Sequence, residues 1–291
     1  MPNYGGAMLL KLKNIGKIYN SNDILTIGIR NINLEFDCNE FVTIEGESGS
    51  GKSTLLNVIA ANDSYEEGEL YFNGEETSHY SNADWEKYRS NSIAMIFQDF
   101  NIIENLTVLE NVELALLRIE STHERRKTAC ELIKRVGLKD QMHQRGSKLS
   151  GGEKQRTVIA RALAQDSPII LADEPTGNLD VKASREIAAL LKEVSKDKLV
   201  IVVTHNPEFF EKYATRRVEI YDGSVKNDKV IEKPTSQDIK INVPYITPKQ
   251  QIKNTFRIGF LNYKSRPKFT ALMSLALCCI AASLFAIMAL M

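Results

Sequence analysis

The stretch from Gly46 to Thr54 constrains the fold of this chain more than any other part of the sequence. It reads GESGSGKST, directly follows the apolar segment FVTIEG, and runs into the helical pattern KSTLLNVIAA. A glycine loop between a buried strand and a helix lets successive backbone N–H groups surround phosphate oxygens, and the helix N-terminus adds its positive dipole end. The sequence therefore predicts a phosphate-binding loop inside an α/β domain.

Within this loop Lys52 is expected to contact the β- and γ-phosphates of a nucleotide, and the Ser53 hydroxyl to coordinate Mg²⁺. Kinases, GTPases and motor ATPases all carry such a loop, so on its own it leaves these classes open. The predicted nucleotide-binding residues of the loop are Gly46, Ser48, Gly49, Ser50, Gly51, Lys52, Ser53 and Thr54.

A second chemical signal stands at the end of the apolar segment IILADE, which closes on Asp173 and Glu174. In an open α/β sheet the carboxyl ends of the strands face the ligand crevice. Asp173 is therefore expected in the Mg²⁺ shell, and Glu174 is expected to polarise an attacking water. A solvated turn or a helix cap would explain an isolated acidic pair, but the upstream phosphate loop favours the catalytic interpretation.

The surrounding sequence predicts how these motifs are organised. From Leu9 to Phe41 short, polar-interrupted β-branched segments favour antiparallel strands. PIILADE and KLVIVVTH are continuous apolar runs, typical of parallel strands covered on both faces. Residues 101–163 read as helices between two core strands, so a helical insertion into an α/β core is expected there.

The stretch LSGGEKQR, from Leu149 to Arg156, is the most discriminating motif of the chain. Ser150 and Glu153 have capping-box spacing, which a structural helix start would explain without any function. Gly151 and Gly152, however, leave the first-turn N–H groups uncovered, so that a second phosphate-binding helix end is available.

With this stretch the chain resembles the ATP-binding cassette (ABC) family, whose signature is similar to LSGG. Four further positions match in order: Tyr19 in GKIYN resembles the aromatic residue that stacks on adenine, Gln98 in IFQDFN the Q-loop glutamine, Asp180 in GNLD the D-loop aspartate, and His205 in VVTHN the switch histidine. A lone Tyr, Gln or His is more often structural, but here all three fall in the expected order. The likeness covers about residues 9–223.

The resemblance implies an ATPase that needs ATP and Mg²⁺ and works as a homodimer with two ATPs between two cassettes. Ser150, Gly151, Gly152 and Glu153 of one chain would then serve the ATP of its partner. In this scheme Lys52, Glu174 and His205 are catalytic, and Ser53, Gln98 and Asp173 hold the metal. The implied fold is a P-loop ABC ATPase with an antiparallel β subdomain, a parallel-sheet core and a helical subdomain, within a nucleotide-binding domain spanning residues 1–227.

Two longer stretches, FQDFNIIENLTVLENVELAL and LADEPTGNLD, are similar to the subgroup that serves lipoprotein release, macrolide export, bacitracin-type peptide resistance and cell-division signalling. Members of this subgroup drive FtsX-like permeases. The resemblance implies an exporter or extrusion system, and leaves open a mechanotransmitting or sensory subunit that couples hydrolysis to an extracellular domain without moving cargo.

The C-terminal part predicts a membrane attachment. Residues 228–248 are expected to be a linker, 249–268 a basic amphipathic juxtamembrane helix, and 269–291 a transmembrane helix, because Thr270 to Met291 carries no charged residue. A helix of that length rises about 33 Å, against roughly 30 Å of hydrocarbon. A core-packed or buried helix is the alternative for each segment. The basic flank places the nucleotide-binding domain on the cytoplasmic side of the cell membrane, and a permease is expected either in cis beyond residue 291 or as a separate FtsX-like subunit.

Composition argues against another class of ABC protein, one acting on DNA or ribosomes. The 37 basic and 37 acidic side chains give no overall field toward nucleic acid, so no nucleic-acid partner is expected. The four cysteines form neither a CxxC pair nor a zinc-like cluster with histidine, which indicates reduced thiols.

Overall fold

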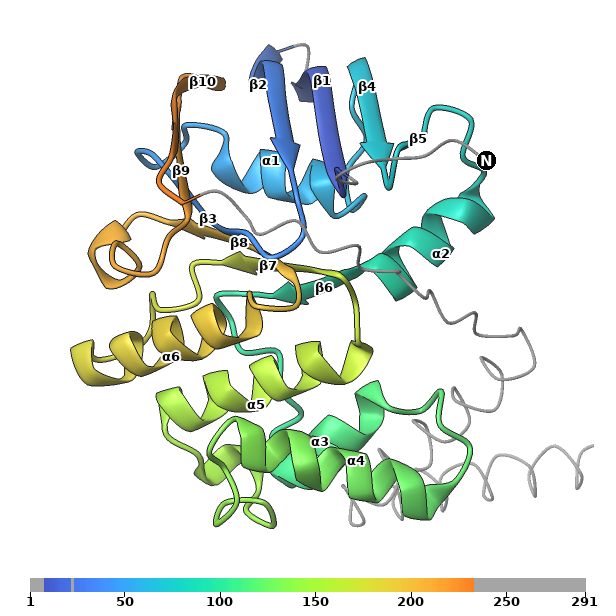
Figure 1. Ribbon diagram of the computed structural model, residues 1–291, viewed down its shortest axis with the longest axis vertical. Helices are drawn as coiled ribbons and strands as arrows, with labels where there is room; N and C mark the ends of the chain where they lie inside the picture. The colour runs from blue at the N-terminus through green and yellow to red at the C-terminus, as the bar shows by residue number, and fades with distance from the viewer. Residues whose placement is uncertain (1–7, 22–23, 233–291) are drawn as a thin grey trace, which may run out of the picture.

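Two β-sheets enclose helix α1 (Lys52–Ile59) (Figure 1). Helices α5 (Gly151–Gln165) and α6 (Val181–Val194) lie on the outer face of the larger sheet, and α3 (Val108–Ala115) and α4 (Thr122–Arg135) pack against α5 on the side away from the sheet. The computed structural model describes residues 8–21 and 24–232. Within them the chain alternates strands and helices after an initial antiparallel hairpin, as the phosphate loop and the apolar runs predict.

The smaller sheet has four antiparallel strands in the order β2, β1, β4, β5. Their bounds are β1 Leu10–Ser21, β2 Ile24–Phe36, β4 Glu67–Phe72 and β5 Glu75–Glu76. The expectation of antiparallel strands over the N-terminal segment is therefore confirmed.

The larger sheet has six strands in the order β10, β9, β3, β8, β7, β6. Their bounds are β3 Phe41–Glu45, β6 Ile93–Ile96, β7 Ile169–Asp173, β8 Leu199–Thr204, β9 Arg216–Tyr221 and β10 Ser224–Val230. All neighbours are parallel except β9 and β10, so the sheet is mixed rather than purely parallel.

A tight turn explains the antiparallel edge. Asp222 and Gly223 connect β9 to β10 with φ angles of 47° and 72°, the backbone that two-residue hairpin loops require. Because of this hairpin, β10 reaches Val230, and its last residues fall inside the stretch 228–248 that was expected to be a linker.

Strands of the larger sheet are apolar throughout because both of their faces are covered. In β8, Leu199, Ile201 and Val203 pack into the cluster around α1, whereas Val200 and Val202 pack into the cluster formed with the outer helices. This two-sided burial is the physical reason for the continuous apolar runs of the sequence.

Six α-helices complete the described fold. They are α1 Lys52–Ile59, α2 Asn82–Ser92, α3 Val108–Ala115, α4 Thr122–Arg135, α5 Gly151–Gln165 and α6 Val181–Val194, with short 3-10 turns at Gly146–Lys148 and Pro207–Phe209. Helices α3, α4 and α5 come between β6 and β7 in the chain, where the sequence predicts a helical insertion over residues 101–163, and α5 continues two residues beyond that range to Gln165.

No helix within residues 8–21 and 24–232 is long and apolar enough to cross a membrane. The expected juxtamembrane helix at 249–268 and the expected transmembrane helix at 269–291 lie outside the described residues, as does most of the expected linker.

Candidate functional site

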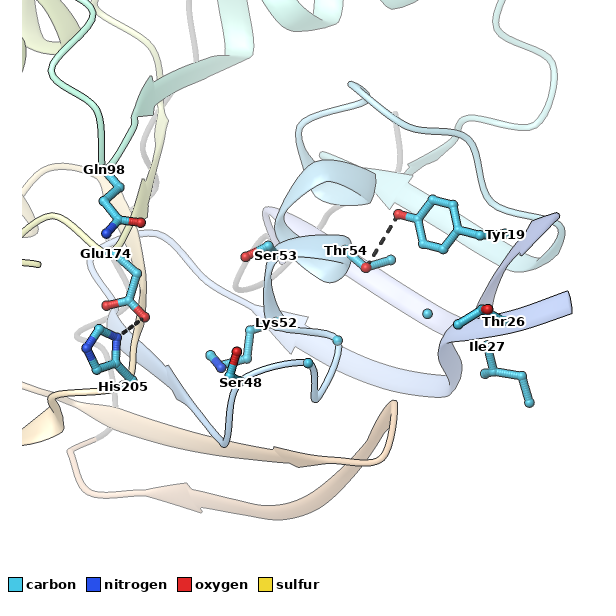
Figure 2. A pocket seen from close by; sticks show the side chains of 13 residues that line it. Tyr19, Thr26, Ile27, Ser48, Lys52, Ser53, Thr54, Gln98, Glu174 and His205 are labelled. Atoms are coloured by element: carbon cyan, nitrogen blue, oxygen red, sulfur yellow. Dashed lines mark hydrogen bonds and ion pairs between the residues drawn. The ribbon is translucent and has the colours of Figure 1, made fainter. Parts of the chain in front are cut away.

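A cavity of about 450 Å³ opens between the two sheets at the N-terminus of α1 (Figure 2). It gathers residues from β1, β2, the loop before α1, and the segments that follow β6, β7 and β8. The lining residues are Tyr19, Thr26, Ile27, Gly28, Ser48, Gly49, Gly51, Lys52, Ser53, Thr54, Gln98, Glu174 and His205.

The glycine loop connects β3 to α1, as the sequence predicts. Gly51 precedes the helix with φ 103°, and no side chain caps the helix start. A Cβ atom at Gly51 would lie 2.4 Å from the carbonyl oxygen of Gly28, so only glycine fits here. The first-turn N–H groups of α1 therefore remain available to an anion at the cavity.

Lys52 is the first residue of α1, and its side chain folds back over the loop. Its Nζ donates to the carbonyl oxygen of Gly46 at 2.9 Å and to that of Glu47 at 2.7 Å. Only 8% of the residue is exposed. These contacts hold a positive charge at the floor of the cavity, where a phosphate group would bind.

Two predicted loop residues, Gly46 and Ser50, do not line the cavity. A Cβ atom at Gly46 would lie 2.3 Å from the carbonyl oxygen of Ile220, and the carbonyl oxygen of Ser50 accepts from the N–H of Gly223 at 3.0 Å. Both residues therefore fix the loop against the end of β9 and the β9–β10 turn.

Glu174 and His205 form the second group at the cavity. Glu174 Oε1 lies 2.7 Å from His205 Nδ1, and the side chains are 12% and 54% exposed (Figure 2). The Asn206 amide Nδ2 lies 3.0 Å from His205 Nε2. A carboxylate only accepts, so Nδ1 carries the proton that it shares with Glu174, and Nε2 accepts from Asn206.

The backbone holds Glu174 in an uncommon conformation. Its φ is 47°, in the left-handed region, and its N–H donates to the carbonyl oxygen of Val203 at 2.9 Å. Its Oε2 is buried and has no hydrogen-bond partner among the described residues. A buried carboxylate oxygen needs a partner, and a water placed there would be held by a group able to accept its proton.

Asp173 lies beside the start of α1. The Ser53 hydroxyl donates to Asp173 Oδ1 at 3.4 Å. Burial and the nearby charge of Glu174 raise the pKa of Asp173, whereas Ser53 and Lys52 act against this rise. A cation beside this carboxylate would relieve the cost of its burial.

Three oxygen donors at or beside the cavity fit a magnesium ion. The Ser53 hydroxyl lies beside the Asp173 carboxylate, and Gln98 lines the same cavity as Ser53. A hydroxyl, a carboxylate and an amide oxygen are hard ligands, and Mg²⁺ keeps most of its remaining positions for water and substrate phosphates. Within the described residues no group of three or more His, Cys, Asp and Glu could hold a metal ion by itself. A site with a few protein oxygens next to a phosphate loop suits Mg²⁺.

Tyr19 lies at the end of the cavity opposite Glu174 and His205 (Figure 2), and 37% of the residue is exposed. The residues Thr26, Ile27 and Gly28 of β2 line the cavity beside it and were not among the predicted site residues. Gly28 carried a usable signal, since a glycine inside the strand pattern ILTIGIR indicates a close backbone approach.

The residues of the LSGG stretch lie elsewhere, in a separate hollow of about 300 Å³. Ser150, Gly151, Gly152 and Glu153 line it together with Asp180, so the structure does not bring these predicted residues to the cavity around Lys52. A mechanism that used both groups on one nucleotide would need two copies of the chain.

The helix start at Ser150 has the capping box that its spacing predicts. Ser150 N donates to Glu153 Oε2 at 2.8 Å, and Glu153 N donates to Ser150 Oγ at 3.4 Å. Asp180 caps α6 with its side chain alone, since its Oδ1 accepts from Ala183 N at 2.9 Å and the alanine returns no bond. The capping box expected from the spacing of Ser150 and Glu153 is thus present, and Ser150 itself is exposed.

The chain is similar in sequence to known proteins. Residues 29–177 match the family model described as ABC transporter. An ABC transporter ATP-binding protein of Methanocaldococcus jannaschii is 43% identical over 219 residues, which are 75% of this chain and 97% of that protein.

Two relatives from export systems are much longer. The macrolide export ATP-binding/permease protein MacB of Bartonella henselae is 36% identical over 254 residues, covering 87% of this chain and 38% of MacB. The pyoverdine export ATP-binding/permease protein PvdT of Pseudomonas fluorescens is 39% identical over 232 residues, covering 79% of this chain and 35% of PvdT.

Solved structures show the same fold. A dimeric post-hydrolysis state of the ATP-binding cassette MJ0796, bound to ADP and Pi, matches with a TM-score of 0.70 and 40% identity. The match covers 77% of this chain and 100% of that one. A second dimeric structure of MJ0796 matches with a TM-score of 0.71.

Proposed function

The chain belongs to the ABC transporter family and is an ATP-hydrolysing subunit of a transporter, and from this premise we propose that it drives export across the cell membrane together with an FtsX-like permease. The single structural observation that carries the hydrolytic part of the proposal is the Glu174–His205 contact of 2.7 Å at the cavity that also contains the phosphate loop. Export is supported by the similarity to MacB and PvdT, whose names describe export proteins.

The cavity suggests a role for each predicted residue. The phosphate loop would hold the nucleotide phosphates through its N–H groups and Lys52, while Glu174 would orient and deprotonate the attacking water, with His205 fixing its carboxylate. Mg²⁺, held by Ser53, Gln98 and Asp173, would neutralise the charge that develops on the phosphates. Tyr19 would stack on the base at the other end of the cavity.

The second hollow supports a homodimer. Because Ser150 to Glu153 and Asp180 lie apart from Lys52 on the same chain, they would reach a nucleotide on a partner chain. The dimeric MJ0796 cassettes, which resemble this chain, support that arrangement. An isolated monomer is then expected to hydrolyse ATP slowly, because its cavity lacks the second helix end.

The length of the MacB match supports a permease in cis. An alignment of 254 residues cannot fit within residues 1–232, so it continues through the expected linker into the stretch expected to be the juxtamembrane helix. We therefore propose a nucleotide-binding domain over about residues 1–227, with its helical subdomain at 101–163, a linker, a juxtamembrane helix and a first membrane crossing. The cassette would lie on the cytoplasmic side.

Transport by inside-out membrane vesicles tests this function. Vesicles containing the native protein with its permease are given ATP and a panel of radiolabelled probes that includes a macrolide and a pyoverdine. ATP-dependent uptake that disappears in Glu174→Gln vesicles supports an exporter. ATP hydrolysis without uptake of any probe, together with ATP-dependent regulation of a cell-wall hydrolase or a sensor kinase, would instead identify a mechanotransmitting subunit.

A further inference from the structure

The hydroxyl of Tyr19 is bound on the side away from the phosphate loop. It donates to Asp63 Oδ2 at 2.8 Å, whereas Thr54 Oγ1 is more distant at 3.4 Å. Asp63 follows the C-terminus of α1 and does not line the cavity around Lys52. Asp63 is therefore connected to this cavity through the Tyr19 hydroxyl, since Tyr19 lines it.

Asp63 is itself fixed by a nearly buried lysine. Lys17 Nζ lies 3.1 Å from Asp63 Oδ1, and the Lys17 side chain is only 7% exposed. Lys17 also donates to Glu66 Oε1 at 2.9 Å and to Ser64 Oγ at 3.2 Å. Each oxygen of the Asp63 carboxylate thus has its own donor, one of them the Tyr19 hydroxyl.

These contacts keep Asp63 ionised. Burial alone would raise the pKa of its carboxyl, but the hydrogen bonds from Tyr19 and Lys17 hold that pKa below its usual range. A hydrogen bond to an ionised acceptor is stronger than one between neutral groups, so the Tyr19 hydroxyl is held firmly.

The ring of Tyr19 is constrained at a second point by β2. A Cβ atom at Gly28 would lie 2.7 Å from Tyr19 Cε2, so the ring rests against the glycine backbone. With its edge against Gly28 and its hydroxyl on Asp63, the ring has little freedom to rotate. Such a ring offers a stacking surface whose orientation is set before the base arrives, which lowers the entropy cost of binding.

We propose that Asp63 is a positioning residue that orients Tyr19 for the base of the bound nucleotide. The inference rests on the proposed stacking role of Tyr19 and adds a residue outside the cavity that determines nucleotide affinity. Because Asp63 does not contact the phosphates, its loss affects nucleotide binding more than the rate of phosphoryl transfer.

A double-mutant cycle tests the inference in the full-length protein. Asp63→Ala and Tyr19→Phe each remove the hydrogen bond, and each is expected to raise the KM for ATP and the directly measured ATP dissociation constant by roughly 3- to 10-fold. The double variant is expected to match the single variants, because both remove one interaction. Asp63→Asn retains an acceptor for the hydroxyl and is expected to restore most of the affinity.

Tyr71→Phe is a matched control. The Tyr71 hydroxyl also donates to a carboxylate, Glu69 Oε2 at 2.6 Å, but Tyr71 does not line the cavity, and its loss is expected to leave the KM unchanged. Additive effects of the two single variants, or an equal shift in Tyr71→Phe, would overturn the inference.

Tyr19→Ala separates the inference from the proposal beneath it. An unchanged KM in Tyr19→Ala would overturn the stacking role and the inference with it. A KM raised by Tyr19→Ala but not by Asp63→Ala or Tyr19→Phe would overturn the positioning role of Asp63 alone. If Asp63→Ala does not fold, Tyr19→Phe decides the same question, because it removes the same hydrogen bond from the other side.

Discussion

Glu174 and His205 follow different strands, β7 and β8, yet their Oε1 and Nδ1 atoms lie 2.7 Å apart. The two strands are parallel neighbours, so their carboxyl ends meet at the same edge of the sheet. The histidine thereby occupies one oxygen of the carboxylate and leaves Oε2 for a water.

His205→Ala is expected to lower kcat for ATP hydrolysis by about 10²-fold, because the Glu174 carboxylate loses the group that fixes its orientation. Steady-state ATPase assays measure this change. His79→Ala is the control, since His79 also contacts a carboxylate, Glu75 at 3.4 Å, but is exposed and does not line the cavity. Equal kcat values for His205→Ala and the wild type would contradict the assignment.

Gly28→Ala is expected to weaken ATP binding by displacing the Tyr19 ring. The new Cβ would lie 2.7 Å from Tyr19 Cε2 and 3.0 Å from Thr54 Cγ2, both too close for the present positions to persist. The ATP dissociation constant is expected to rise about 10-fold. This corresponds to a loss of about 1.4 kcal/mol of binding free energy, which one misplaced contact can cost. In a Tyr19→Ala background the same substitution is expected to have a much smaller effect, and equal effects in both backgrounds would count against this explanation.

Asp173→Asn is expected to raise the Mg²⁺ concentration at half-maximal ATPase activity by at least about 10-fold, because a hard divalent ion loses a charged ligand. Magnesium titrations of chelator-treated protein measure the shift. Removal of the ion alone should abolish turnover reversibly. An unchanged Mg²⁺ requirement in Asp173→Asn would place the ion elsewhere.

Ser150→Ala separates the capping role of this serine from its proposed role toward the partner chain. Loss of the cap is expected to cost about 1 kcal/mol of unfolding free energy. Thr107→Ala removes a similar capping box, formed with Glu110 at the start of α3, and is expected to cost a similar amount. We expect ATPase activity to fall in Ser150→Ala only, and equal losses in both variants would leave Ser150 a structural cap.

The sequence was sufficient for those parts of the fold whose signals are local. The apolar runs at 169–173 and 199–204 predicted two strands covered on both faces, and the glycine loop predicted the β3–α1 junction. The helical insertion and the antiparallel N-terminal strands also follow from short-range periodicity.

Features that depend on pairing between distant segments were not predicted. Strands β4 and β5 and helix α2 fall in a stretch where no element was expected, because the pairing of β4 with β1 is a tertiary contact. The Asp222-Gly223 pair is a hairpin signal that was overlooked within a polar stretch.

The residues of the site also divide into those with a local sequence signal and those that depend on contacts between distant segments. Its motifs identified most of the residues that line the cavity, but Thr26, Ile27 and Gly28 enter it only because β2 lies beside the loop. The Tyr19–Asp63 bond likewise joins β1 to the segment after α1 and has no signature in the sequence.

Turnover of the Glu174→Gln variant, with its assembly state in ATP measured alongside, tests whether Glu174 activates the water that attacks ATP. We expect a fall in ATP turnover of at least about 10²-fold and a stable ATP-bound dimer, because the amide cannot take a proton from the water while the rest of the site still binds the nucleotide. Turnover at the wild-type rate would contradict the role of Glu174 and the mechanism built on it.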